Sequence, residues 1–191
     1  MTSVLATEGN YQAFTLGGVE LDWLYFAMAC GVVSLLVAGL LMKETLAADQ
    51  GTAVMKEIAA AIQEGAVAFL RRQFKGILLI IIPLAILVAL TATKVVEPNG
   101  TIALSKLDSA VARAVAFLVG ATFSGLTGFI GMSLSVRGNV RTAAAARLGD
   151  NAGALRVAFR TGGITGLFVV GLGLIGAAGI TLVFQNSVVE V

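Results

Sequence analysis

Four stretches of this chain, each at least 18 residues long, contain no Asp, Glu, Lys, Arg or His. These uncharged runs are residues 23–42, 76–93, 114–136 and 161–189. At a rise of about 1.5 Å per residue, even the shortest reaches about 27 Å as an α-helix, close to the thickness of a bilayer core. The runs therefore predict an all-α integral membrane protein with four transmembrane helices, the last of them at residues 161–184.

The composition excludes several other classes of protein. Charged residues make up 13% of the chain, 58% of residues are hydrophobic and the mean hydropathy is +0.94, whereas a soluble domain carries about twice that charged fraction. A net charge of +2 is too small to indicate nucleic-acid binding. There is no histidine, so the common zinc sites and histidine acid–base chemistry are absent. The one cysteine, Cys30, lies in the first run and is interpreted as a small buried hydrophobic residue.

The cations predict the orientation. Ten of the thirteen lie in two segments, residues 43–75 and 137–160, which the positive-inside rule assigns to the cytoplasm. The N-terminal tail 1–22, the loop 94–113 and the C-terminal end 185–191 are then external. The tail contains Glu8, Glu20 and Asp22 but no cation, so the first run is not interpreted as a secretory signal peptide.

The two cytoplasmic segments are expected to be helical extensions of the spans. In the amphipathic segment 43–75, apolar residues recur at helical spacing from Met55 to Leu70, which predicts a helix that runs straight into the second span. Pro83 should kink that helix, with neighbouring helices shielding the freed carbonyl. In the external loop, proline and Asn-Gly at residues 97–100 predict a turn.

Glycine patterns predict close helix packing. Residues 171–176, GLGLIG, match the letters of a dinucleotide-binding fingerprint, but no strand precedes them and they lie in an uncharged run, so a nucleotide site is rejected. Small residues also recur every four positions, which allows backbones to approach in lipid. These rows are Gly162 with Gly166, and Gly120 with Ser124 and Gly128. We expect Gly128 and Gly166 to lie against neighbouring helices.

Two arginine pairs, Arg137 with Arg141 and Arg156 with Arg160, share helical faces. Each pair could hold a phosphate, but anchoring to lipid headgroups and setting the topology explain them better. The sequon at Asn99 is interpreted as a chance match.

No catalytic, cofactor-binding or metal-binding residue is predicted in this chain. The uncharged runs offer no ionisable group for a proton or sodium pathway. The cytoplasmic acids are too few and too dispersed for a magnesium–phosphate site. They are Glu44, Asp49, Glu57, Glu64 and Asp150.

Three blocks of sequence resemble membrane-bound, ion-pumping inorganic pyrophosphatases. The first is GTAVMKEIAAAIQEGAVAFLRRQF at residues 51–74, which is similar to that family's first cytoplasmic segment. The second is GATFSG at 120–125 with Gly128, Gly131 and RGNVRTA at 137–143, and the third is AFRTGG at 158–163 with Gly166 and VGLGL at 170–174. Phe69, Phe74 and Gly138 depart from the family's usual residues.

The resemblance implies the N-terminal portion of a homodimeric pump that couples hydrolysis of magnesium pyrophosphate to outward transport of protons, or of sodium in some members. Potassium is a further cofactor in some members. The four helices would belong to an outer ring of a larger helical bundle in a bacterial inner membrane. The family's catalytic motifs would follow residue 191, so this portion alone is expected to be inactive. Two alternatives remain at this point: a self-standing four-helix assembly module and a passive channel subunit.

Overall fold

The computed structural model describes residues 17–96 and 102–189. They form four long helices, in agreement with the predicted fold class: α1 (Gly18–Ala47), α2 (Ala53–Leu90), α3 (Lys106–Arg147) and α4 (Asn151–Val189). All four are long and apolar enough to cross a membrane. A short antiparallel pair, β1 (Val95–Val96) and β2 (Ile102–Leu104), was not predicted. The turn at residues 97–100 and the sequon at Asn99 lie outside the described residues.

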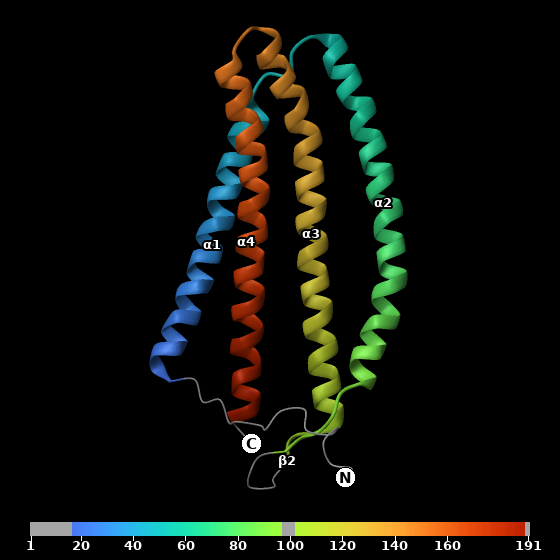
Figure 1. The fold of residues 1–191 in the computed structure, drawn as a ribbon, viewed down its shortest axis with the longest axis vertical. Coiled ribbons are helices and arrows are strands. Elements are labelled where there is room, and N and C mark those ends of the chain that lie inside the picture. The colour runs from blue at the N-terminus through green and yellow to red at the C-terminus, as the bar shows by residue number, and fades with distance from the viewer. Residues whose placement is uncertain (1–16, 97–101, 190–191) are drawn as a thin grey trace, which may run out of the picture.

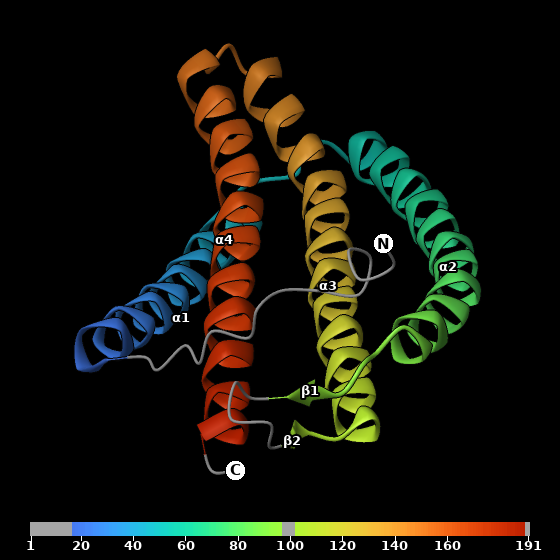
Figure 2. The same ribbon diagram turned by 60° about the horizontal axis from the view of Figure 1, so that its bottom comes forward.

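The helices form an open row in the order α1, α4, α3, α2 (Figure 1). α1 packs on α4, α4 on α3, and α3 on α2, so α1 and α2 occupy the two edges of the row (Figure 2). The α1–α2 and α3–α4 connections lie at one end, which we call the basic end, at the top of Figure 1. The opposite end carries β1 and β2 and is called the hairpin end.

Side chains and turn glycines define where the helices begin and end. The Thr52 hydroxyl accepts a hydrogen bond from Met55 N at 3.3 Å and caps α2, and Ser105 Oγ accepts one from Asp108 N at 3.2 Å and caps α3. Gly51 and Gly149 both have φ of +79°, a conformation that favours glycine, in the two tight connections of the basic end. The helical extensions predicted at this end are thus present, and α2 is one continuous helix through residues 55–74.

The buried core lies where α1, α3 and α4 meet. Ala38, Leu134 and Ile164 are almost completely buried and contact each other, one from each of these helices. One turn away, Ser34 Oγ of α1 donates a 2.9 Å hydrogen bond to the carbonyl oxygen of Leu167 on α4. Hydrogen bonds between membrane helices add about 0.6 kcal/mol each. α2 has no share in this core.

Two close helix contacts use glycines that lie outside the predicted rows of small residues. A Cβ placed on Gly31 of α1 would lie 3.0 Å from the Gly171 carbonyl oxygen of α4, and one on Gly138 of α3 would lie 2.5 Å from Thr161 Oγ1. By contrast, a Cβ on Gly128 or Gly166 meets nothing within 4 Å. Both residues are exposed, so the expected close contacts of Gly128 and Gly166 are not formed among the described helices.

The interpretation of the GLGLIG stretch as a packing surface is confirmed at two of its three glycines. Gly171 meets α1, and a Cβ on Gly176 would lie 3.0 Å from Phe123 Cδ2 of α3. Gly173 has no neighbour within 4 Å. The five-residue spacing of Gly171 and Gly176 thus lets α4 contact helices on both sides.

α2 continues through Pro83 and is curved along its length (Figure 2). Pro83 leaves the Leu79 carbonyl without its helical donor. Both residues lie on an exposed face of α2, and Leu79 is 77% exposed, so the described helices do not provide the shielding that was expected. α2 ends at Leu90, three residues before the end of the second uncharged run.

Candidate functional site

Arg141 is the most strongly engaged side chain at the basic end. Its Nε donates to the Ala48 carbonyl at 3.1 Å, one terminal nitrogen donates to Leu46 O at 2.7 Å, and the other donates to Arg137 O at 2.6 Å. Leu46 lies in the last turn of α1 and Ala48 is the C-cap residue, and carbonyl groups at such a helix end lack helical partners. Arg141 therefore ties the end of α1 to α3.

The surroundings of Arg141 disfavour the charged form of its guanidinium. Its residue is only 6% exposed, and burial together with the neighbouring Arg137 cation lowers the pKa of its guanidinium. A guanidinium nevertheless stays protonated at physiological pH. Because Nε and both terminal nitrogens already donate to carbonyl oxygens, the Arg141 side chain serves the contact between α1 and α3, a role that the sequence did not predict.

The other three arginines of the predicted pairs are exposed. Arg160 forms an ion pair with Glu44 of α1, with 3.0 Å between the terminal nitrogen and the carboxylate oxygen. Because both side chains are largely open to solvent, such a pair adds at most about 1 kcal/mol. Within the described residues, the side chains of Arg137 and Arg156 have no hydrogen-bond or ion-pair partner, which is compatible with headgroup anchoring.

A polar cavity of about 340 Å³ opens at the basic end between the end of α1, the start of α2 and α3. Lys56 and Gln63 line it from α2, and Arg137 and Arg141 line it from α3. None of the described acids lines this cavity. It could accept an anion, but it lacks the carboxylates that a magnesium–phosphate site needs.

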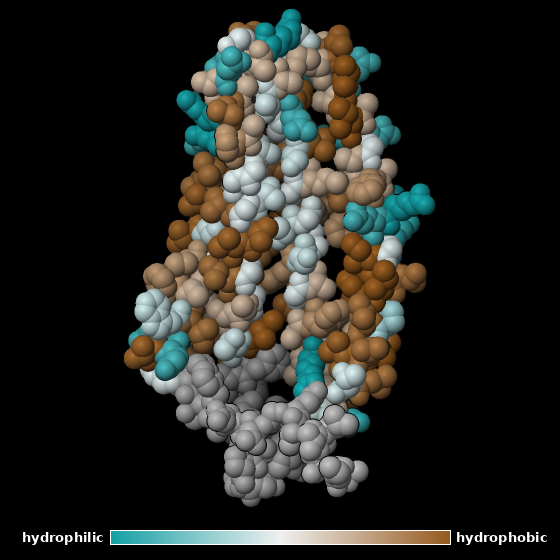
Figure 3. All heavy atoms as spheres, in the orientation of Figure 1, coloured by the Kyte–Doolittle hydropathy of each residue, from teal (hydrophilic) through white to brown (hydrophobic). Residues whose placement is uncertain are grey.

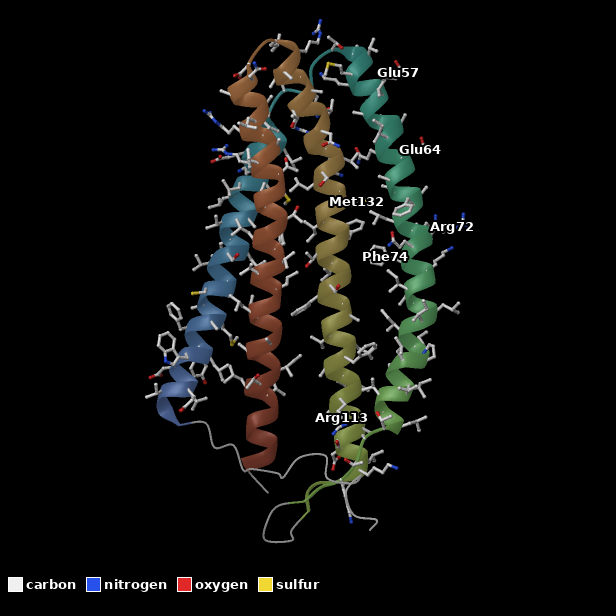
Figure 4. All side chains as sticks on the ribbon, viewed as in Figure 1. Glu57, Glu64, Arg72, Phe74, Arg113 and Met132 are labelled. Carbon is white, nitrogen blue, oxygen red and sulfur yellow. The ribbon has the colours of Figure 1, made fainter. Side chains whose placement is uncertain are left out.

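Three of the five acids at the basic end bond to groups close by in the structure. Asp49 accepts a hydrogen bond from Gly51 N, Asp150 accepts one from Gly153 N at the start of α4, and Glu44 pairs with Arg160. Glu57 and Glu64 point away from α3 (Figure 4). Across residues 17–96 and 102–189, no group of three or more His, Cys, Asp or Glu could hold a metal ion. No reaction step is assigned to these acids.

A second, apolar groove of about 750 Å³ separates α2 from α3. Leu70 and Ile77 line one wall, and Leu118 and Met132 line the other. The Phe74 side chain points from α2 toward α3 (Figure 4), where a Cβ on Gly125 would lie 3.2 Å from its Cε1 atom. Phe74 therefore makes a close contact with α3 across a groove that otherwise separates the two helices.

These features define a class of protein first: an integral, multi-pass helical membrane protein, whose described polar groups mostly serve packing and helix ends. The comparison with known families then gives the particular family. Residues 32–191 match the family described as Inorganic H+ pyrophosphatase. This chain belongs to that family.

Three relatives illustrate the similarity. Proteins named K(+)-insensitive pyrophosphate-energized proton pump are 42% identical over 182 residues in Streptomyces avermitilis, 43% over 162 residues in Chloroflexus aurantiacus and 38% over 164 residues in Methanosarcina mazei. The alignments cover 86%, 80% and 86% of this chain. They cover 21%, 21% and 22% of the relatives, so the chain spans about a fifth of their length.

Proposed function

We propose that this chain is the N-terminal, outer scaffold portion of a membrane pump that couples hydrolysis of inorganic pyrophosphate to proton transport out of the cytoplasm. The observation that carries the proposal is the family match over residues 32–191, together with relatives whose names describe such a pump. Those names favour protons over sodium and a pump that does not require potassium. Mg²⁺, which would neutralise the substrate's charge, is assigned to parts of the pump outside residues 1–191.

The basic end is proposed to face the cytoplasm, and the hairpin end the outside, in the inner membrane of a bacterium. Support comes from the cation distribution, because ten of thirteen Lys and Arg lie in residues 43–75 and 137–160. The two segments meet at one end of the helix row, as a four-span topology requires (Figure 1).

The scaffold role is supported by surfaces that residues 1–191 leave uncovered. Ile58 and Ile62, one turn apart near the start of α2, form an apolar stripe near the polar basic end, and each is more than half exposed. An apolar stripe of this kind normally packs against another element. It is proposed to pack against the remaining helices of the larger bundle, which functions as a homodimer.

The test is a transport assay on the complete purified pump in sealed vesicles. Adding Mg²⁺ and pyrophosphate in potassium-free buffer should release phosphate and acidify the vesicle lumen. Residues 1–191 alone should insert into the membrane yet release no phosphate above empty vesicles. Hydrolysis without acidification would refute the coupling, and activity of residues 1–191 alone would refute the scaffold role.

A further inference from the structure

The contacts between α2 and α3 fix which residues lie at the same depth in the membrane. A Cβ placed on Gly125 of α3 would lie 3.2 Å from Phe74 Cε1 of α2, so these two residues lie at nearly the same depth. The helices are antiparallel, so residue numbers increase in opposite directions (Figure 1). Arg72 is then level with Thr127, and Lys75 with Ser124, both inside the third uncharged run.

In this register, the stretch over which α2 and α3 are both uncharged is too short to cross a bilayer core. Lys75 is level with Ser124, and Arg113 lies eleven residues farther along α3, which corresponds to about 16 Å of helix. A hydrocarbon core is about 30 Å thick. Any core that spans both helices must therefore enclose the cations of α2, Arg113 or both.

The register of the other helices shows which charge is enclosed. Ser34 of α1 bonds to Leu167 of α4, and Gly131 of α3 contacts Thr165 of α4, so Ser34 and Gly131 lie at nearly the same depth. The uncharged runs 23–42 and 114–136 therefore overlap along most of their length. The run of α2 alone is displaced toward the hairpin end, so it is the cations of α2 that fall inside the common core.

Those cations are Arg71, Arg72 and Lys75, and all three are exposed. Arg72 points away from α3 (Figure 4), and a hydrophilic patch interrupts the apolar edge of α2 midway along the helix (Figure 3). None of the three has an ion-pair partner among the described residues. From the level of Arg72, the end of the third run at residue 136 is about 14 Å away, which is farther than an arginine side chain extends to reach headgroups.

We infer that the outer face of α2 around Arg71, Arg72 and Lys75 is an interface with another membrane helix of the pump, one that carries carboxylates at this depth. Cations inside a membrane face protein or water and pair with opposite charges, because hydrocarbon cannot solvate them. Charge complementarity thus specifies an acidic partner. The apolar remainder of this face, including Leu79 and Leu90, packs on the same neighbour. The inference rests on the proposed function, since the partner belongs to the pump outside residues 1–191.

The first test compares two triple variants of the complete pump. In the test variant Arg71, Arg72 and Lys75 are all replaced by Gln, and in the control Lys43, Arg147 and Arg156, which are exposed at the basic end, are replaced by Gln. The test variant should unfold at a clearly lower temperature, because it leaves buried carboxylates unpaired. The control should match the wild type. Equal stability of both variants and the wild type would overturn the inference.

The second test does not depend on a destabilised variant. Arg72→Cys, and separately Lys75→Cys, is introduced into a complete pump without other reactive cysteines, with Arg147→Cys as the aqueous control. A water-soluble maleimide should label Arg147→Cys in the native pump, but should label Arg72→Cys and Lys75→Cys only after denaturation. Labelling of these two at the control rate would mean a water-filled surface and would refute the acidic interface. Pyrophosphate-driven acidification by the wild-type pump is measured alongside, so that failure of the proposed function is recognised separately.

Discussion

Arg141 shows how a single buried cation can stabilise a helix end. The last carbonyl groups of α1 would otherwise lack donors in a partly buried connection, and Arg141 supplies donors to two of them, Leu46 O and Ala48 O. Hydrogen bonds from charged donors contribute more than neutral ones. The sequence marked this residue as a cation near the cytoplasm, but spacing alone could not show that the end of α1 lies beside it.

Replacing Arg141 with Gln should therefore destabilise the complete pump. Glutamine cannot reach all three carbonyl oxygens, and we expect a loss of about 3 kcal/mol in the free energy of unfolding. Arg147→Gln, at an exposed position on the same helix, should change it by less than about 0.5 kcal/mol. Denaturant unfolding of both variants provides the measurement, and equal stabilities would show that the network contributes nothing.

A second prediction concerns the contact of α1 with α4. In Gly31→Ala the new methyl group would lie 3.0 Å from the Gly171 carbonyl and 2.8 Å from Ile175 Cγ1, so the helices must move apart. Overpacking of this kind costs about 1–3 kcal/mol. Gly39→Ala is the matched control, because a Cβ there meets nothing within 4 Å. A thermal unfolding midpoint that falls only for Gly31→Ala is expected, and equal midpoints would contradict the close approach.

Among the four helices, α2 differs from the others because, within the described residues, it packs extensively only on α3. Its contact includes the close approach of Phe74 to Gly125. Gly125→Leu should push Phe74 aside and loosen α2, whereas Gly120→Leu, on the same helix with no neighbour within 4 Å, should not. Limited proteolysis in the α1–α2 connection should then be faster for Gly125→Leu only. Equal cleavage rates in both variants would show that the contact of Phe74 with Gly125 does not hold α2 against α3.

The sequence predicted the elements better than their contacts. Uncharged runs and apolar periodicity were sufficient for four helices and for the extension of α2 through residues 55–74. They could not give the register between helices, because a periodic pattern defines a face but not the partner or the depth of that face. This is why Gly128 and Gly166 were assigned to interfaces that Gly31 and Gly138 occupy instead. For the same reason, the uncharged runs placed Arg71, Arg72 and Lys75 outside the spans.

At the scale of the whole molecule, the proposed orientation has a direct test. In a Cys30→Ala background without other reactive cysteines, Asn99→Cys should react with an impermeant thiol reagent added to intact cells. Asp150→Cys, at the basic end, should react only after the cells are opened. The opposite pattern would reverse the topology, because the positive-inside rule would then be violated by seven of the ten cations that lie outside the common core.

We propose that this chain contributes scaffold to a pyrophosphate-driven pump and that the chemistry occurs in other parts of that pump. The most direct measurement is hydrolysis of magnesium pyrophosphate by the complete pump after all five acids of the basic end are neutralised. The changes are Glu44→Gln, Asp49→Asn, Glu57→Gln, Glu64→Gln and Asp150→Asn. Asparagine still caps helices and turns, so folding should be preserved. We predict a rate of the same order as that of the wild type. A loss of about 100-fold or more, the size expected when a reacting group is removed, would show that these acids take part in the reaction.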